Sequence, residues 1–293
     1  MPRSYLKNRS LTLVDSAQTI LVMLAIEYPH AVSFFERVGP LLKKREFENN
    51  LLLSSLLSLT KQSAQGVRFF AVDNEPGPQA ASLLTNQGRL VAVASNGEAS
   101  AVLARHLASQ GHKVNIVFAP RETAATFADT YEGFEHHGDQ VLMKCERLQP
   151  IVPSEGIFRL ATMKDFVLLT SWARAFVKEC RLNDSPKEVE DTLRKFIECR
   201  QAFVWETEKG PVAMAACGGP TDKAARISFV YTSPRARKRG YAQTLVHRLT
   251  YKVLKEKKAA VLFADAANKT SVSLYRRLGY EVLQEFSEFR ARV

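Results

Sequence analysis

Cysteine is scarce in this sequence. Only four cysteines occur in 293 residues, and no two of them have the Cys-x-x-Cys spacing that is typical of zinc sites and redox motifs. No histidine stands at ligand spacing from any of them. The pattern argues against a disulfide framework and favours reduced thiols that pack inside a cytoplasmic protein. We therefore expect no metal ion.

Two adjacent histidines, His136 and His137, are the remaining hint of a metal site. They lie in the polar stretch Glu135-His136-His137-Gly138-Asp139. Neighbouring histidines on a loop rarely converge on one ion without further ligands. We therefore interpret residues 135–139 as a solvated linker.

Long apolar runs are also missing. No stretch reaches the roughly 18 uninterrupted apolar residues of a candidate membrane-spanning helix. Residues 11–26 are rich enough in apolar side chains to suggest a signal sequence, but Thr12, Asp15, Gln18 and Thr19 interrupt them and no small-residue cleavage site follows. We interpret this stretch as an amphipathic helix and expect a soluble protein without a membrane partner.

Acidic residues are nearly absent from residues 235–258. This segment contains nine Lys or Arg side chains and a single acid, Glu256, whereas residues 1–150 are almost balanced. The formal net charge of the whole chain is +11, so most of the excess is concentrated in one place. A local polyanionic ligand or partner is implied.

The basic segment begins where a strand is predicted to give way to a helix. A β-branched and aromatic run over residues 227–231 ends at Ser233-Pro234, and a helical apolar period starts after Gly240. The first amides of a helix and the positive end of its dipole attract anions, and a glycine lets a ligand approach the backbone closely. The turn before this helix is therefore a predicted phosphate site.

Two motifs in this region carry a resemblance. Arg237-x-x-Gly240-x-Ala242 follows a predicted strand that ends Val230-Tyr231-Thr232, and Asn268-x-x-Ser271-x-x-x-Tyr275-x-x-x-Gly279-Tyr280 comes downstream. In this order and spacing the motifs resemble the GNAT superfamily of acyl-CoA-dependent N-acyltransferases. The resemblance covers the C-terminal half and implies a mixed α/β, GNAT-like fold there, with a strand, two helices and an antiparallel meander leading into the motif strand.

The resemblance also implies a site. The motif strand is expected to separate from its neighbour, so that its backbone holds the pantetheine arm of coenzyme A, while the amides of the turn bind the pyrophosphate and Tyr275 lies beside the sulfur. Arg235, Lys238 and Arg239 are possible helpers for the phosphates. The implied cofactor-binding residues are Val230, Tyr231, Thr232, Arg237, Lys238, Arg239, Gly240, Tyr241, Ala242, Asn268 and Ser271.

The chemistry of acyl transfer sets two further requirements. A lysine-like amine with a pKa of about 10.4 is neutral only roughly once in 2,500 molecules at pH 7, so a base or an acceptor with a lowered pKa is needed. The departing thiolate needs a proton, which the phenol of Tyr275 can supply as general acid. Residues 226–232 contain no acid, so the base is unassigned; Glu206 and Asp265 are weighed as groups that act through water.

The chain is long enough for two domains. Pro150, Pro153 and Gly156 mark a predicted boundary between a domain at 1–150 and a catalytic domain at 151–293. The strand–helix–strand–helix succession of residues 90–134 recurs at 227–280, which suggests that the first domain is a degenerate GNAT-like copy. It lacks the motif arginine and glycine, and Asp129 aligns with Tyr275, so we expect a structural or substrate-shaping role.

The leading hypothesis is an N-acetyltransferase that moves an acetyl group, or another short acyl group, from acetyl-CoA to a primary amine by direct attack in a ternary complex. A non-catalytic acyl-CoA-binding regulatory protein and a nucleic-acid-binding module are the alternatives. The retained tyrosine favours the enzyme, and the basic cluster has few interleaved aromatic residues for nucleic acid. The acceptor amine and the oligomeric state stay open.

Overall fold

The computed structural model describes residues 23–61 and 64–292, which divide into two units. Unit 1 comprises the described residues up to Gln140 together with those from Gln284 onward, and unit 2 is Val141–Leu283. None of the helices in the described residues combines the length and the apolar character needed to span a bilayer.

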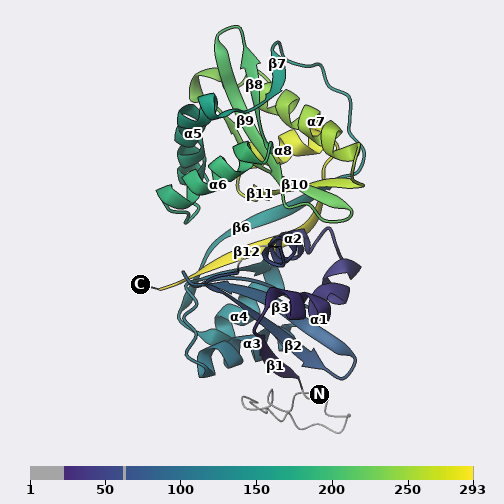
Figure 1. The fold of residues 1–293 in the computed structure, drawn as a ribbon, viewed down its shortest axis with the longest axis vertical. Helices are drawn as coiled ribbons and strands as arrows, with labels where there is room; N and C mark the ends of the chain where they lie inside the picture. Colours follow the sequence, from purple (N-terminus) through teal and green to yellow (C-terminus); the bar gives the residue numbers. More distant parts are fainter. Residues whose placement is uncertain (1–22, 62–63, 293) are drawn as a thin grey trace. The chain divides into compact units, whose positions relative to one another are not determined.

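Unit 1 is a mixed sheet with helices on both faces (Figure 1). Its strand order is β1-β2-β3-β4-β5-β12-β6; β4 and β5 are parallel, and β5 and β12 are antiparallel. Helices α3 and α4 pack on one face and α1 and α2 on the other. Its elements are β1 (Leu24–Tyr28), α1 (Ala31–Lys44), α2 (Asn50–Leu59), β2 (Val67–Asn74), β3 (Gly77–Thr85), β4 (Arg89–Ala94), α3 (Gly97–Ser109), β5 (Ile116–Pro120), α4 (Arg121–Tyr131), the first part of β6 (Phe134–Cys145) and the larger part of β12 (Glu281–Ala291).

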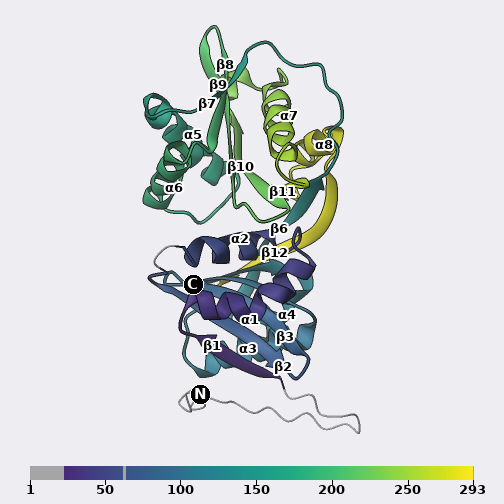
Figure 2. The ribbon, with the colours of Figure 1, turned by 45° about the vertical axis from the view of Figure 1, so that its right-hand side comes forward.

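Unit 2 repeats this architecture. Its strand order is β6-β11-β10-β9-β8-β7, and β10 and β11 are its parallel pair. Helices α5 and α6 cover one face of the sheet, whereas α7 and α8 cover the other (Figure 2). Its elements are β7 (Ile157–Leu160), the 3-10 turn η1 (Met163–Asp165), α5 (Phe166–Glu179), α6 (Pro186–Glu198), β8 (Ala202–Thr207), β9 (Gly210–Gly218), β10 (Ala224–Thr232), the 3-10 turn η2 (Pro234–Ala236), α7 (Tyr241–Leu254), β11 (Ala259–Asp265) and α8 (Lys269–Arg277).

The order of elements confirms the predicted fold class. The succession β2-β3-β4-α3-β5-α4 of unit 1 has the same types and order as β8-β9-β10-α7-β11-α8 of unit 2, and in both the parallel pair is the one joined through a helix. Parallel neighbours need such a connection because the chain must return to the same end of the sheet before the second strand begins. The chain is therefore an α/β protein built from two similar units.

The last strand of each half departs from a simple tandem arrangement. Strand β5 pairs with β12, from Phe286 opposite Pro120 to Arg290 opposite Ile116, and β6 follows beyond β12. The C-terminal segment of the chain thus completes unit 1, while β6 passes from unit 1 into unit 2 at Gln140. The division of the structure therefore lies before the proline-rich stretch at 148–156, where the sequence suggested a boundary.

Two local predictions need correction. Most of the predicted helix at residues 11–26 lies outside the described residues, but Leu24–Tyr28 is strand β1, paired with β2. Residues 135–139 are not a linker but part of strand β6. His136 and His137 are exposed there, and the Nε2 atom of His136 lies 2.9 Å from Oδ1 of Asp139. A polar strand without hydrophobic alternation has no period-2 signal in the sequence.

Candidate functional site

Strands β10 and β11 separate before they end. Their paired stretch runs from Ala224 opposite Ala259 to Ile227 opposite Leu262, although β10 continues to Thr232 and β11 to Asp265. On its other side β10 is bulged, because its register against β9 shifts between Ser228 and Tyr231. Phe229, inside the bulge, has a φ of 51°, a conformation that bulky residues rarely adopt. The predicted separation of the motif strand is present.

The turn after β10 presents the start of α7. Gly240 is the N-cap residue of α7 with a φ of 77°, and no side chain caps the helix there. The first amides of a helix have no partner within the helix, so here they are available to a ligand. A Cβ atom at position 240 would stand only 2.7 Å from Oγ of Ser154, whose hydroxyl donates to the Arg239 carbonyl at 2.9 Å. Both the positive φ and the close approach require glycine.

Basic side chains surround this turn. Arg235, Lys238 and Arg239 are exposed, and a positive helix end among three cations favours a multiply charged anion. Arg237 has a different environment: its guanidinium donates two hydrogen bonds to the Glu179 carboxylate, at 2.8 and 2.9 Å, and its Nε donates to the Thr232 carbonyl at 3.1 Å. The motif arginine is therefore anchored to the end of α5.

The three predicted residues at the end of β10 have different surroundings. Val230 packs against the core beneath α7 and α8, whereas Tyr231 lies in the core beneath α5 and α6, with its ring centroid 6.2 Å from that of Trp172. The Oγ1 atom of Thr232 is buried and has no hydrogen-bond partner among the described residues. A buried hydroxyl without a partner is costly, so this atom is a natural contact for a bound polar group.

The second motif builds α8. Asn268 caps this helix through a hydrogen bond that its Oδ1 accepts from the Ser271 amide at 3.0 Å. Tyr275 follows one turn after Ser271, on the same face of the helix. At the end of α8, Gly279 has a φ of 95°, and a Cβ atom there would lie 2.4 Å from the Arg147 carbonyl oxygen. The motif thus includes residues that the fold itself requires.

Tyr275 is 7% exposed. Burial raises the pKa of its phenol above the ordinary value, and the nearby Cys180 thiol raises it further. Burial likewise raises the pKa of Cys180 to about 11, helped by the charges of Asp265 and Glu179. The phenol is therefore protonated throughout the neutral range, which is the state that a proton donor needs.

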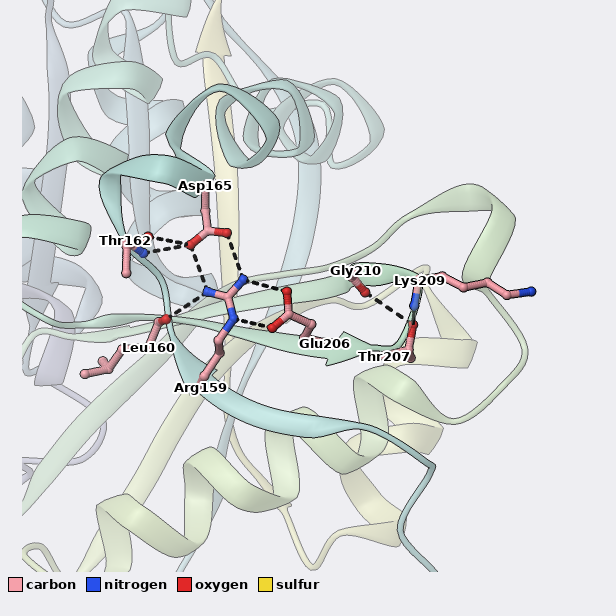
Figure 3. Close-up of polar contacts among 8 residues, drawn as sticks. All are labelled: Arg159, Leu160, Thr162, Asp165, Glu206, Thr207, Lys209 and Gly210. Carbon is pink, nitrogen blue, oxygen red and sulfur yellow. Dashed lines mark hydrogen bonds and ion pairs between the residues drawn. The ribbon is translucent and has the colours of Figure 1, made fainter.

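Glu206, one of the two weighed bases, belongs to an ion network (Figure 3). Arg159 on β7 donates to both Glu206 oxygens, at 2.7 and 2.9 Å, and to both Asp165 oxygens, each at 2.9 Å. These bonds lower the pKa of Glu206 below its ordinary value. A lowered pKa makes the carboxylate a weaker base, so the network indicates a structural role.

Asp265, the other weighed base, stands at the exposed end of β11 and accepts a hydrogen bond from the Ala267 amide at 2.8 Å. Its charge reaches Cys180, the residue that also influences Tyr275. Asp265 therefore borders the group of side chains around Tyr275, whereas Glu206 is held by Arg159.

At the corresponding turn in unit 1, a side chain already caps the start of the helix. Asn96 is the N-cap residue of α3, and its Oδ1 accepts a hydrogen bond from the Ala99 amide at 2.9 Å. Glu98 adds a negative charge to the first turn. An occupied amide and a local carboxylate both disfavour phosphate, in contrast to the open N-terminus of α7.

A cavity and a possible metal site were the other candidates for a functional site. A cavity of about 270 Å³ opens near the C-terminal end of α7, with Phe203, Cys217 and Lys252 among its lining residues, away from the turn at Gly240. Within the described residues, no group of three or more His, Cys, Asp or Glu side chains is arranged to hold a metal ion.

Comparison with known proteins relates the fold to a family. The family model described as FR47-like protein matches residues 207–289, which include the bulged strand, the turn and α8. No curated protein matches the sequence. The similarity to known proteins therefore comes from this model and from solved structures.

Three solved structures share the fold at low identity. A GCN5-related N-acetyltransferase from Sphaerobacter thermophilus is 15% identical with a TM-score of 0.60, covering 91% of this chain and 95% of its own. A GNAT-family acetyltransferase from Colwellia psychrerythraea is 13% identical with a TM-score of 0.56, covering 78% and 87%. A tandem GNAT protein from the clavulanic acid biosynthesis pathway is 12% identical with a TM-score of 0.55, covering 92% and 98%.

Proposed function

We propose that this chain, which has the GNAT fold and resembles the GNAT superfamily, is an N-acetyltransferase that transfers an acetyl group from acetyl-CoA to a primary amine. One observation carries the proposal. The open N-terminus of α7, the separated ends of β10 and β11 and the buried phenol of Tyr275 occur together in unit 2.

The residues of unit 2 fit the donor. The free amides at the start of α7 would bind the two phosphates of the pyrophosphate, with Lys238 and Arg239 adding positive charge. The unpaired backbone of β10 near Val230, together with the buried Thr232 hydroxyl, would hold the polar groups of the pantetheine arm. Bound acetyl-CoA supplies the acyl group as a thioester.

The proton balance assigns a role to Tyr275. The attacking amine loses a proton when the new C–N bond forms, and the sulfur must gain one when the C–S bond breaks. Tyr275 would donate to the sulfur, since its raised pKa keeps the phenol protonated. The amine enters as the neutral base, in a ternary complex, and its proton passes to water or to a carboxylate such as Asp265. The Tyr275 phenolate then takes up a proton from water, which restores the starting state.

For unit 1 we propose a structural or substrate-shaping role. Its turn is capped by Asn96 and carries Glu98, so it would not bind the donor in the same way. The proposal thus assigns catalysis to unit 2 and the degenerate copy to unit 1, with most of β12 as the strand that the C-terminal end of the chain contributes to unit 1.

The direct test is an acyl-transfer assay. The full chain is mixed with acetyl-CoA and a panel of primary amines that includes diamines, amino acids and peptide N-termini, and free thiol release and acetylated product are both followed. We expect thiol release that depends on one class of amine and matches product one to one. Binding of acetyl-CoA without thiol release for any amine would instead support a non-catalytic acyl-CoA-binding protein.

A further inference from the structure

The guanidinium of Arg237 is held between two elements of unit 2. Besides its two hydrogen bonds to Glu179 and one to the Thr232 carbonyl, it lies over the ring of Tyr231, 5.3 Å from the centroid. The Tyr231 hydroxyl in turn donates to Oε1 of Glu179 at 3.4 Å. Arg237 therefore joins the turn to α5 and β10 at once, because Nη2 donates to both Glu179 oxygens while a second nitrogen, Nε, donates to the Thr232 carbonyl. A lysine ammonium has only one nitrogen and cannot make both sets of contacts in this way.

The end of α5 adjoins the proposed reaction centre. Glu179 is the last residue of α5, and Cys180 directly after it influences the pKa of Tyr275. The Tyr231 ring packs against Trp172, also on α5. A contact that fixes α5 against the turn thus fixes the wall of the site against the strand that orients the donor.

We infer that Arg237 is a positioning residue that locks the donor turn to helix α5 through Glu179, and is not a ligand of the donor phosphates. The inference rests on the proposed function. The two charges of the pair neutralise each other locally, so attraction of phosphate falls to the helix amides, Lys238 and Arg239. Arg237 and Glu179 then act as one unit, and removing either has the same consequence.

The test uses Arg237→Gln, Glu179→Gln and the double variant in the full chain. Donor affinity is measured by calorimetric titration with coenzyme A, and kcat and KM by thiol release. We expect each single variant to lower kcat about 10-fold through misalignment, with the double variant no worse than either single one. Donor affinity should change by no more than about twofold, because the amides that bind phosphate are untouched.

If Arg237 binds phosphate instead, the two single substitutions should change the affinity for coenzyme A in opposite directions. If Arg237 were a phosphate ligand, Arg237→Gln would weaken coenzyme A binding about 10-fold or more, whereas Glu179→Gln would strengthen it by releasing the guanidinium. That pair of results overturns the inference. Additive losses of kcat in the double variant would overturn it as well.

Three further variants distinguish a positioning role from a general effect on folding. Arg174 and Glu190 form another Arg–Glu pair of unit 2, joining α5 to α6, and Arg174→Gln and Glu190→Gln should leave kcat and donor affinity unchanged. Arg237→Lys, which keeps the charge but loses the separate Nε contact with the Thr232 carbonyl, should fall between the wild type and Arg237→Gln in kcat. A wild-type chain that binds no coenzyme A would overturn the proposed function, and this inference with it; wild-type activity combined with loss of binding in Arg237→Gln overturns the inference alone.

Discussion

The substitution Asp165→Asn tests the ion network of unit 2 most sharply. Asp165 is 8% exposed and accepts four hydrogen bonds, two from Arg159 and two from Thr162, the latter from its amide at 2.8 Å and its hydroxyl at 3.1 Å. The network ties β7 to β8 and to the start of α5. An amide side chain keeps the shape but removes the charge and one acceptor oxygen.

The expected loss of folding stability in Asp165→Asn follows from the pKa of Asp165. The Arg159 guanidinium, as the largest cause, lowers this pKa from 3.8 to about 2, which corresponds to about 2 kcal/mol of stability at neutral pH. We therefore expect Asp165→Asn to destabilise unit 2 by about 2 kcal/mol, and to lower its melting temperature by roughly 4–8 °C.

The stability that the Asp165 carboxylate contributes should decrease as the pH falls. Because the folded-state pKa is the lower one, the charged carboxylate contributes its stability fully above about pH 4 and loses it as the pH falls toward 2. Thermal unfolding of the wild type and Asp165→Asn is followed from pH 7 to pH 2.5, with Asp191→Asn on the exposed face of α6 as a control. The difference between wild type and Asp165→Asn should shrink with acid. A difference that is absent at pH 7, or that grows as the pH falls, would refute this reasoning.

Two other predictions concern tyrosines of the second motif. Tyr275→Phe should lower kcat with little change in coenzyme A affinity, and unaltered kcat in the variant would remove Tyr275 from the mechanism. In the wild type, kcat should show no loss from phenol deprotonation below about pH 10, because burial raises the Tyr275 pKa above that value. Thr250→Val should cost about 1–3 kcal/mol, since it leaves the buried Tyr280 hydroxyl without the oxygen now 2.6 Å away. Adding Tyr280→Phe to that variant should recover part of the loss in urea unfolding, and a further loss would contradict the prediction.

The sequence was informative where the signal is local. The apolar period after Gly240 predicted α7, and Leu245, Leu249 and Val253 are buried on its inner face. Gly240 was recognised from the turn itself, and its positive φ agrees with that prediction. Local periodicity and turn chemistry fix such features because the interacting groups are close along the chain.

Features that depend on distant contacts could not be predicted. The Arg237–Glu179 pair joins residues that the sequence separates by helix α6 and the strands β8, β9 and β10, and nothing near Arg237 indicates its partner. The pairing of β5 with β12 is of the same kind. Glu206 was weighed as a base that acts through water because it lies on the meander before the motif strand, and only its contact with Arg159 shows what holds it.

The most direct measurement is calorimetric titration of the full chain with coenzyme A and with acetyl-CoA, followed by the same titration of Gly240→Asp. The control is Gly210→Asp at the β8–β9 turn, where the glycine also has a positive φ but a Cβ atom would meet nothing within 4 Å. The account predicts micromolar binding by the wild type and Gly210→Asp, and loss of binding in Gly240→Asp, because bulk and negative charge then stand where phosphate must approach. Equal binding by all three proteins, or no binding by the wild type, would contradict it.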